Sequence, residues 1–239
     1  MFGCSADQMW PDSEYYWMTA AVDQNKPYEL VLSGHHSSYL HILMNDYEKA
    51  EAVASKVSEL SKMHQIPYFA ATSTCMLGHA RAQLGYALEG MELIRDGLAR
   101  IQAIGPIGVS YFTAYLAEAQ MRADRIRDAR RTIEAALNVN VDELACRPEI
   151  LRLRGEINLK QGRVEEAEVD FHESIALAQT MSAKAWELRA VMSLGRLLKS
   201  QGRHGEARAM LAEIYGWFTE GFDTADLRDA RALLDELSE

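Results

Sequence analysis

Small and apolar residues recur along the chain with a fixed spacing, and polar, helix-forming stretches separate them. Each copy of the pattern holds a small residue, a turn-forming residue seven positions later, and a second small residue after another five positions. Successive copies start 38 to 40 residues apart. The first small residues are Ser38, Gly78, Ala117, Gly155 and Gly195; the turn residues are Asn45, Gly85, Asp124, Gly162 and Gly202; the second small residues are Ala50, Gly90, Ala129, Ala167 and Ala207.

This spacing predicts pairs of antiparallel helices. Two such helices approach closely only where their side chains are small, so we expect the two small residues to mark their crossing. Gly, Asn or Asp suits the left-handed conformation that ends a helix. An apolar residue four positions after the second small residue shares its helix face and is expected to fill the layer between hairpins. These residues are Ala54, Ile94, Ile133, Phe171 and Leu211.

The arrangement resembles the tetratricopeptide (TPR) signature, in which a small residue of helix A and an alanine of helix B carry most of the pattern. The period exceeds the usual value of about 34 residues, which adds about one helical turn per repeat. The resemblance implies an all-α fold, a right-handed α-solenoid of TPR-like helix hairpins with a C-terminal capping helix. We expect a tail and a partial repeat helix over 1–25, five repeats over about 26–66, 67–106, 107–146, 147–183 and 184–223, and the capping helix over 224–239.

Both ends of the predicted stack carry residues that would close it. A helix over residues 12–24 precedes the first hairpin, and its aromatic residues Tyr15, Tyr16 and Trp17 are expected to cover the open end of the core. At the other end, Thr224 is a predicted N-cap for a final helix with one apolar face. That face carries Leu227, Ala230, Leu234 and Leu237. Four further aromatic residues, Trp186, Trp217, Phe218 and Phe222, are expected to lie in the core.

Charge and cysteine content limit the class of protein. The net charge of −10 repels a phosphate backbone, so nucleic acid is not expected as a partner. Cys4, Cys75 and Cys146 are widely spaced and form no CxxC pair, which argues against a disulfide framework and a cysteine zinc site and favours the cytoplasm. No basic and apolar leader and no apolar window of about 18 residues is present, so neither secretion nor membrane insertion is expected.

The C-terminal two-fifths carries a more specific resemblance. The stretches 151–162 (LRLRGEINLKQG), 186–190 (WELRA), 202–211 (GRHGEARAML) and 214–226 (IYGWFTEGFDTAD) look like the C-terminal TPR region of large bacterial adenylate/guanylate-cyclase-like proteins and STAND-type ATPase regulators. In that family, catalytic or DNA-binding and NTP-binding domains precede repeats that are thought to bind partners. Because this sequence has no GxxxxGK[ST] phosphate loop, the family's activity is not carried over. Whether the chain is free-standing or the C-terminal part of a larger regulator stays open.

In a TPR stack the A helices line the concave surface. The positions one after the first small residue and three or six before it are expected to face this groove. Their character changes along the chain from aromatic and His to charged, which suits a peptide or helix with one apolar and one charged end. The alternative is that these are only solvent-exposed residues of a structural scaffold. The residues expected to contact a partner are His35, Tyr39, His79, Tyr111, Tyr115, Glu118, Arg152, Glu156, Arg189 and Arg196.

The sequence shows no arrangement typical of catalysis or metal binding. His35, His36 and His41 lie in one segment, but adjacent histidines point about 100° apart on a helix, and a spacing of five places His36 and His41 poorly for a shared ion. GxSxG, HExxH and Gly-rich dinucleotide motifs are missing. We therefore expect no catalytic residue, no metal and no cofactor, and the chain is not predicted to be an enzyme.

Together these features predict a cytoplasmic, non-catalytic protein interaction module of bacterial signalling or regulation, which binds a peptide or helix of an unidentified protein in its groove. An alternative from another class is a small-molecule sensor with a pocket between the A helices of repeats 2 and 3, lined by His79, Tyr111 and Tyr115. A third hypothesis is a homodimer formed through the N-terminal end, because an uncapped repeat exposes an apolar face.

Overall fold

A computed structural model describes residues 26–105, 108–139 and 145–238 of the chain. Within these ranges the chain forms eleven helices and no strand, which confirms the predicted all-α class. The helix expected over residues 12–24, with Tyr15, Tyr16 and Trp17, lies outside the described residues. The chain divides into two compact units, Met1–Arg125 and Ile126–Glu239, and each is described by itself.

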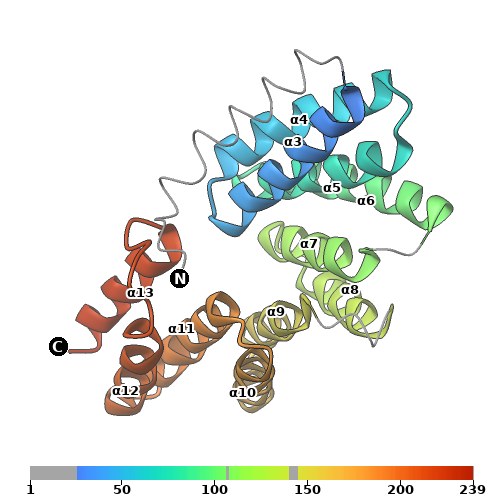
Figure 1. The fold of residues 1–239 in the computed structure, drawn as a ribbon. Helices are drawn as coiled ribbons and strands as arrows, with labels where there is room; N and C mark the ends of the chain where they lie inside the picture. The colour runs from blue at the N-terminus through green and yellow to red at the C-terminus, as the bar shows by residue number, and fades with distance from the viewer. Residues whose placement is uncertain (1–25, 106–107, 140–144, 239) are drawn as a thin grey trace. The chain divides into compact units, whose positions relative to one another are not determined.

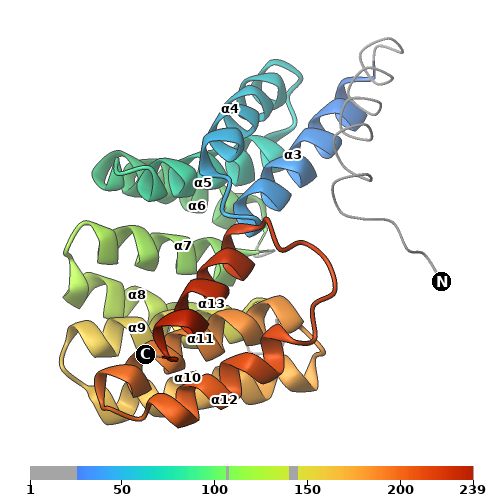
Figure 2. The same ribbon diagram turned by 90° about the vertical axis from the view of Figure 1, so that its left-hand side faces the viewer.

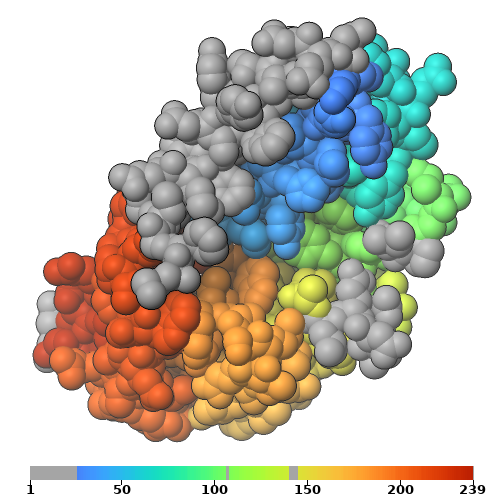
Figure 3. Space-filling view, viewed as in Figure 1, coloured from blue at the N-terminus to red at the C-terminus, as the bar shows by residue number. Residues whose placement is uncertain are grey.

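The first unit contains two antiparallel helix hairpins and one further helix (Figures 1 and 2). Its helices are α3 (Pro27–Leu43), α4 (Tyr47–Met63), α5 (Pro67–Gln83), α6 (Ala87–Ile104) and α7 (Val109–Arg122). α3 pairs with α4 and α5 with α6, while α7 packs against both α5 and α6. Proline at the start of α3 and α5 fits the first helical turn, because its fixed φ is helical and its missing N–H has no partner there to lose. The space-filling view shows part of the surface of the first unit, with α3 in blue (Figure 3).

The second unit contains six helices. They are α8 (Ile126–Val139), α9 (Arg147–Lys160), α10 (Val164–Thr180), α11 (Lys184–Ser200), α12 (His204–Tyr215) and α13 (Ala225–Glu236). α9 pairs with α10 and α11 with α12, α8 packs against α9, and α13 packs against α11 and α12 (Figure 2). Consecutive hairpins are joined through α10 and α11, so the core runs continuously from α9 to α13.

All five predicted turn residues have a left-handed backbone. Their φ values are 57° at Asn45, 101° at Gly85, 57° at Asp124, 73° at Gly162 and 76° at Gly202. The amide of the next residue bonds back across the helix end, as Tyr86 N does to the carbonyl of Arg81 at 2.9 Å, which satisfies a carbonyl that the helix leaves without a partner. Gln65 and Ser182 also have positive φ values, 55° each. The sequence did not reveal these two turns, because neither residue type is typical of that conformation.

The small residues of the first two copies mark a helix crossing, as predicted. A Cβ atom added to Gly78 would lie 2.6 Å from the carbonyl oxygen of Gly90. In the first copy, the Ser38 hydroxyl donates a hydrogen bond to the carbonyl of Ala50 at 3.4 Å. The backbones of α3 and α4, and of α5 and α6, therefore approach each other where the two small residues face.

The later glycines have other neighbours. A Cβ atom on Gly155 would meet the ring of Phe171 at 2.5 Å, whereas one on Gly195 would find only Cδ2 of Leu233 at 3.6 Å. The predicted close approach of Gly195 to Ala207 is therefore wrong, because the side chain of Leu233 on α13 is the nearest neighbour instead. The predicted layer residues are fully buried in every copy: Ala54, Ile94, Ile133, Phe171 and Leu211.

Helix α13 closes the core of the second unit with one apolar face. Its buried residues are Leu227, Ala230 and Leu233, and Leu237 at its C-cap is buried as well. Leu234, which the sequence placed on this face, is only half-buried. Thr224 stands at the predicted N-cap position, but the predicted cap is wrong in its chemistry. The Thr224 hydroxyl donates to the carbonyl of Gly221 at 2.7 Å and accepts no bond from an amide of α13.

Candidate functional site

Three tyrosines predicted to line the groove meet in the first unit. The rings of Tyr39 on α3 and Tyr111 on α7 have centroids 5.6 Å apart. Tyr115 lies one turn after Tyr111, with a centroid distance of 4.5 Å, and its hydroxyl donates a hydrogen bond to the Tyr111 hydroxyl. With His79 and Glu118, these residues form what we call the tyrosine cluster.

His79 joins α5 to this cluster. Its ring stacks on that of Tyr115, with centroids 3.7 Å apart and planes 14° from parallel. The His79 Nδ1 atom lies 3.8 Å from Oε2 of Glu118, and the other carboxylate oxygen of Glu118, Oε1, lies 3.9 Å from the guanidinium of Arg122. His79 is only 3% exposed and Tyr115 only 5%. His79 and Tyr115 are therefore the buried members of the cluster.

Burial keeps the phenol groups of Tyr111 and Tyr115 neutral. Removal from water raises the pKa of Tyr111 and of Tyr115 well above the ordinary value of 10, and the neighbouring tyrosines add to the effect at Tyr111. A neutral phenol both donates and accepts hydrogen bonds. The cluster therefore offers hydroxyl groups and ring edges for contact, and no phenolate that would act as a nucleophile or base.

His35 lies one turn before Tyr39 on α3 and contacts α5. Its ring packs against Phe69 with centroids 5.0 Å apart, and its Nδ1 atom lies 3.4 Å from the Thr72 hydroxyl. Burial, together with the charge of neighbouring His36, lowers the pKa of His35 to about 4. The side chain is therefore neutral near pH 7 and belongs to the packing of α3 against α5.

The cluster fills the place where the sequence predicted a small-molecule pocket. His79, Tyr111 and Tyr115 were expected to line an opening between two A helices, but the rings of His79 and Tyr115 stack directly on each other. A ligand between them would first have to separate these rings. Tyr39, Tyr111 and Glu118 remain half-buried, so their edges are available to a partner at the surface.

In the second unit, the predicted groove residue Arg152 is engaged within the protein. Its guanidinium forms two hydrogen bonds of 2.8 Å with the carboxylate of Glu149, one turn earlier on α9. It also lies 3.4 Å from Glu156 and 3.3 Å from the Ser193 hydroxyl on α11. Ser193 in turn donates to Glu156 at 2.7 Å. This charged network therefore links α9 to α11, and the side chain of Arg152 is bonded within the protein instead of pointing freely into a groove.

Arg189 extends this network to the capping helix. Its Nε donates to Asp226 of α13 at 2.7 Å, and its guanidinium lies 5.2 Å from the ring centre of Trp186. Burial alone would lower the pKa of Arg189, but the negative charges of Asp226 and Glu149 outweigh burial and raise it. Arg196, the last predicted groove residue, is exposed.

Two aromatic residues expected in the core are exposed instead. Trp217 is 58% exposed and Phe222 is 46% exposed. Both lie in the connection between α12 and α13, where the shortened helix α12 ends at Tyr215 and no further hairpin covers them. Lys184 lies over one face of the Trp217 ring, 6.0 Å from its centre. Aromatic content alone could not distinguish these positions from core positions.

Among the residues that the structure describes, no three His, Cys, Asp or Glu side chains gather as metal ligands would. Cys75 is fully buried, and burial raises the pKa of its thiol, so the reactive thiolate is disfavoured. Of the described helices, none is long and apolar enough to cross a membrane.

The chain is similar to solved helical-repeat structures. The Thermus thermophilus TPR protein TTC0263 superposes with a TM-score of 0.64 at 17% identity, over 87% of this chain and 98% of that one. This chain has the fold of TPR proteins. The STAND protein PH0952 of Pyrococcus horikoshii, which carries a TPR sensor, matches with a TM-score of 0.62 at 14% identity over 93% of this chain and 34% of its own. The predicted resemblance to TPR proteins, STAND-type regulators among them, is confirmed at the level of the fold.

A third match is the apo form of the quorum sensor NprR from B. thuringiensis. Its TM-score is 0.61 at 14% identity, over 88% of this chain and 60% of that one. No protein-family model and no curated protein matches the chain.

Proposed function

We propose that this TPR chain is a non-catalytic interaction module, which binds a peptide or helix of a partner protein over the tyrosine cluster. One observation supports this most: Tyr39, Tyr111 and Glu118, from two different A helices, are held half-buried on one surface. The buried ring of Tyr115 packs against Tyr111, and the buried His79 lies 3.8 Å from Glu118. Tyrosine offers a rigid apolar face and a polar tip at little entropic cost, which is why it is enriched where proteins bind each other.

We expect the charged residues of the second unit to contribute less to binding of the partner than the tyrosine cluster does. Arg152, Glu156 and Arg189 already bond within the protein, so a partner would gain little by pairing with them and would break existing bonds. Arg196 is exposed and is the predicted groove residue in this unit that a partner would reach most easily. We therefore place the apolar part of the partner at the first unit.

A role in bacterial signalling or regulation, in the cytoplasm, is part of the proposal. It is supported by the likeness in fold to a STAND protein with a TPR sensor and to a quorum sensor. Both of those chains are longer than the part that this chain matches. The homodimer hypothesis concerns the N-terminal end, which lies outside the described residues, and it stays a prediction.

Affinity capture from cells of the source organism tests the binding surface. The tagged chain is compared with Tyr111→Phe and Glu118→Gln, which remove one hydroxyl and one charge and keep the side-chain volume. Tyr86→Phe is the matched control, because Tyr86 is 61% exposed and lies outside the cluster. We expect one specific protein to be captured by the original chain and the control, and to be reduced severalfold with the two cluster variants. Equal capture by all four chains would refute the proposed surface.

A further inference from the structure

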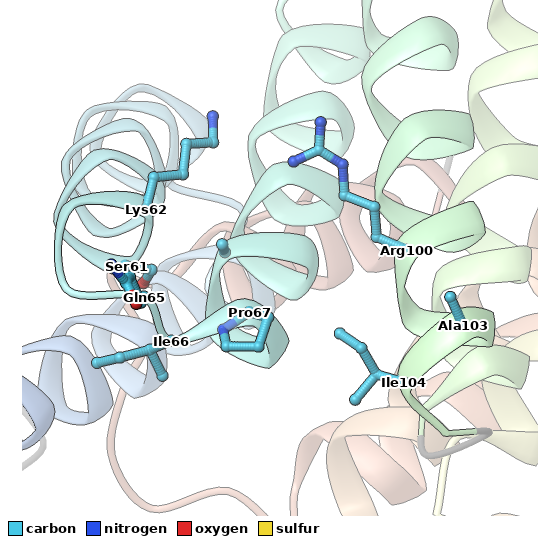
Figure 4. Close-up of a pocket in the computed structure, with 9 residues that line it drawn as sticks. Ser61, Lys62, Gln65, Ile66, Pro67, Arg100, Ala103 and Ile104 are labelled. Atoms are coloured by element: carbon cyan, nitrogen blue, oxygen red, sulfur yellow. The ribbon is translucent and has the colours of Figure 1, made fainter.

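A hollow in the first unit lies away from the tyrosine cluster. It opens between the C-terminal ends of α4 and α6 and the N-terminal end of α5, with a volume of about 530 Å³ (Figure 4). Sites for small molecules usually measure about 300 to 1,000 Å³. Most of its wall is apolar, formed by Ile66, Pro67, Ala70, Ala103 and Ile104. The hollow shares no residue with the proposed protein-binding surface.

Two cationic side chains stand at the rim of this hollow. Lys62 extends from α4 and Arg100 from α6, on the same side in Figure 4. Arg100 is already paired with Asp96, at 2.9 Å, whereas the Lys62 ammonium group has no ion pair within the described ranges. No acidic residue lines the hollow. A ligand bound there would therefore meet one uncompensated positive charge beside an apolar wall.

Two further features of the wall favour an anion. Ser61 is fully buried, and its hydroxyl has no hydrogen-bond partner among the residues that the structure describes. Helix α5 begins at Pro67 with Ile66 as its N-cap, so no side chain caps its first amides. The N-terminus of a helix attracts negative charge. Ser61 and Lys62 are adjacent residues near the end of α4, and the helix end belongs to α5.

We propose that this hollow binds an aliphatic carboxylate of medium chain length. The carboxylate would lie by Lys62 and the start of α5, and the hydrocarbon chain would lie against Ile66, Pro67 and Ile104. One unpaired cation suits a singly charged acid better than a phosphate, which carries up to two charges and needs more donors. The apolar wall would exclude small hydrophilic acids, because they bury too little apolar surface to bind.

Nuclear magnetic resonance titration of the ¹⁵N-labelled full chain tests the proposal with octanoate as the probe. Octan-1-ol and octylamine serve as neutral and cationic probes of equal length. We expect saturable shifts of the amides of Ile66, Ala70 and Ile104, with octanoate bound at least threefold more tightly than octan-1-ol. Lengthening the acid from six to ten carbons should tighten binding by roughly two- to fourfold per methylene.

Three variants distinguish the contribution of the Lys62 charge to binding from that of the shape of the hollow. Lys62→Met should weaken octanoate binding about two- to fivefold, within the range for one exposed ion pair, and leave octan-1-ol binding unchanged. Lys56→Met, at an exposed lysine of the same helix, should change neither, and Ala103→Phe should abolish both by filling the hollow. Lys62 and Ala103 are exposed, so both variants should fold, which circular dichroism checks. Equal affinity for the three probes, no effect of Lys62→Met, or no saturable shift would overturn the proposal.

Discussion

Gly78 and Gly90 cross so closely that a methyl group on Gly78 would lie 2.6 Å from the carbonyl oxygen of Gly90. The atom that such a group would meet belongs to the backbone, and no side-chain rotation can move it away. This contact sets the distance between α5 and α6. The recurrence of small residues at this spacing is therefore a constraint of packing and not an accident of composition.

Gly78→Ala should destabilise the protein by about 1 to 3 kcal/mol, because the new methyl group overpacks a backbone contact. Gly195→Ala should instead stabilise it by roughly 0.5 to 1 kcal/mol, because alanine favours the helix and the added Cβ would meet only Leu233 at 3.6 Å. Urea unfolding of the two variants beside the original chain measures both effects. Equal destabilisation by the two substitutions would show that the glycines are equivalent, against the structure.

Gly202, in the turn before α12, and Gly205, in its first turn, distinguish the effect of backbone strain from that of packing. An added Cβ atom meets nothing within 4 Å at either Gly202 or Gly205, but only Gly202 has a left-handed backbone, with φ of 76°. Gly202→Ala should cost about 1 to 2 kcal/mol, whereas Gly205→Ala should be neutral or stabilising by up to about 1 kcal/mol. Thermal unfolding compares them. A neutral Gly202→Ala variant would contradict the left-handed turn.

His35 should make the protein less stable in mild acid. Its pKa is about 4 in the folded chain and about 6.5 in an unfolded chain. Between these values the unfolded state binds more protons, so stability is retained above about pH 6.5 and is lost as the pH falls toward 4. The loss attributable to this group is on the order of 2 kcal/mol.

The measurement is the free energy of unfolding from pH 7 to pH 4 for the original chain and for His35→Gln. The variant should lose about 2 kcal/mol less over this range, while His64→Gln, at an exposed histidine of the same unit, serves as the control. Parallel pH profiles for the original chain and His35→Gln would mean that His35 is not buried as the structure shows.

The exposed tryptophan near the C-terminus should matter little for stability. Trp217→Ala is expected to change the free energy of unfolding by less than about 0.5 kcal/mol, the usual range for a surface position. Phe171→Ala, at a fully buried ring, should cost about 3 to 5 kcal/mol. Chemical unfolding followed by circular dichroism measures both. A large loss with Trp217→Ala would restore the prediction that this residue belongs to the core.

The repeat pattern predicted those features that depend on backbone geometry and residue size. The left-handed turns at Asn45 and Gly85 and the buried layer residue Phe171 follow directly from residue type and spacing. Left-handed turns at Gln65 and Ser182 were missed, since local propensity does not favour those residues there and the surrounding helices impose the conformation.

The candidate site was harder to predict, because helical phase gives the direction of a side chain and not its neighbours. Phase placed Tyr39, His79 and Tyr111 on A helices, but it did not show that His79 and Tyr115 would stack and close the expected pocket. Likewise, it placed Arg152 on the groove face without revealing its pairing with Glu149 and Ser193. Pairing of this kind depends on distances between helices, which residue spacing does not contain.

Site-specific photo-crosslinking tests the binding surface most directly. A photoreactive benzoyl-phenylalanine replaces Tyr39 in one chain and Tyr86 in another, and both are irradiated in cells of the source organism. Position 39 lies beside Tyr111 in the cluster, whereas position 86 is exposed and outside it. We expect one protein to crosslink at position 39 and not at position 86, and to disappear with Glu118→Gln. The same crosslinked proteins at both positions, or none at position 39 in cells where a partner is captured by affinity, would contradict binding over the tyrosine cluster.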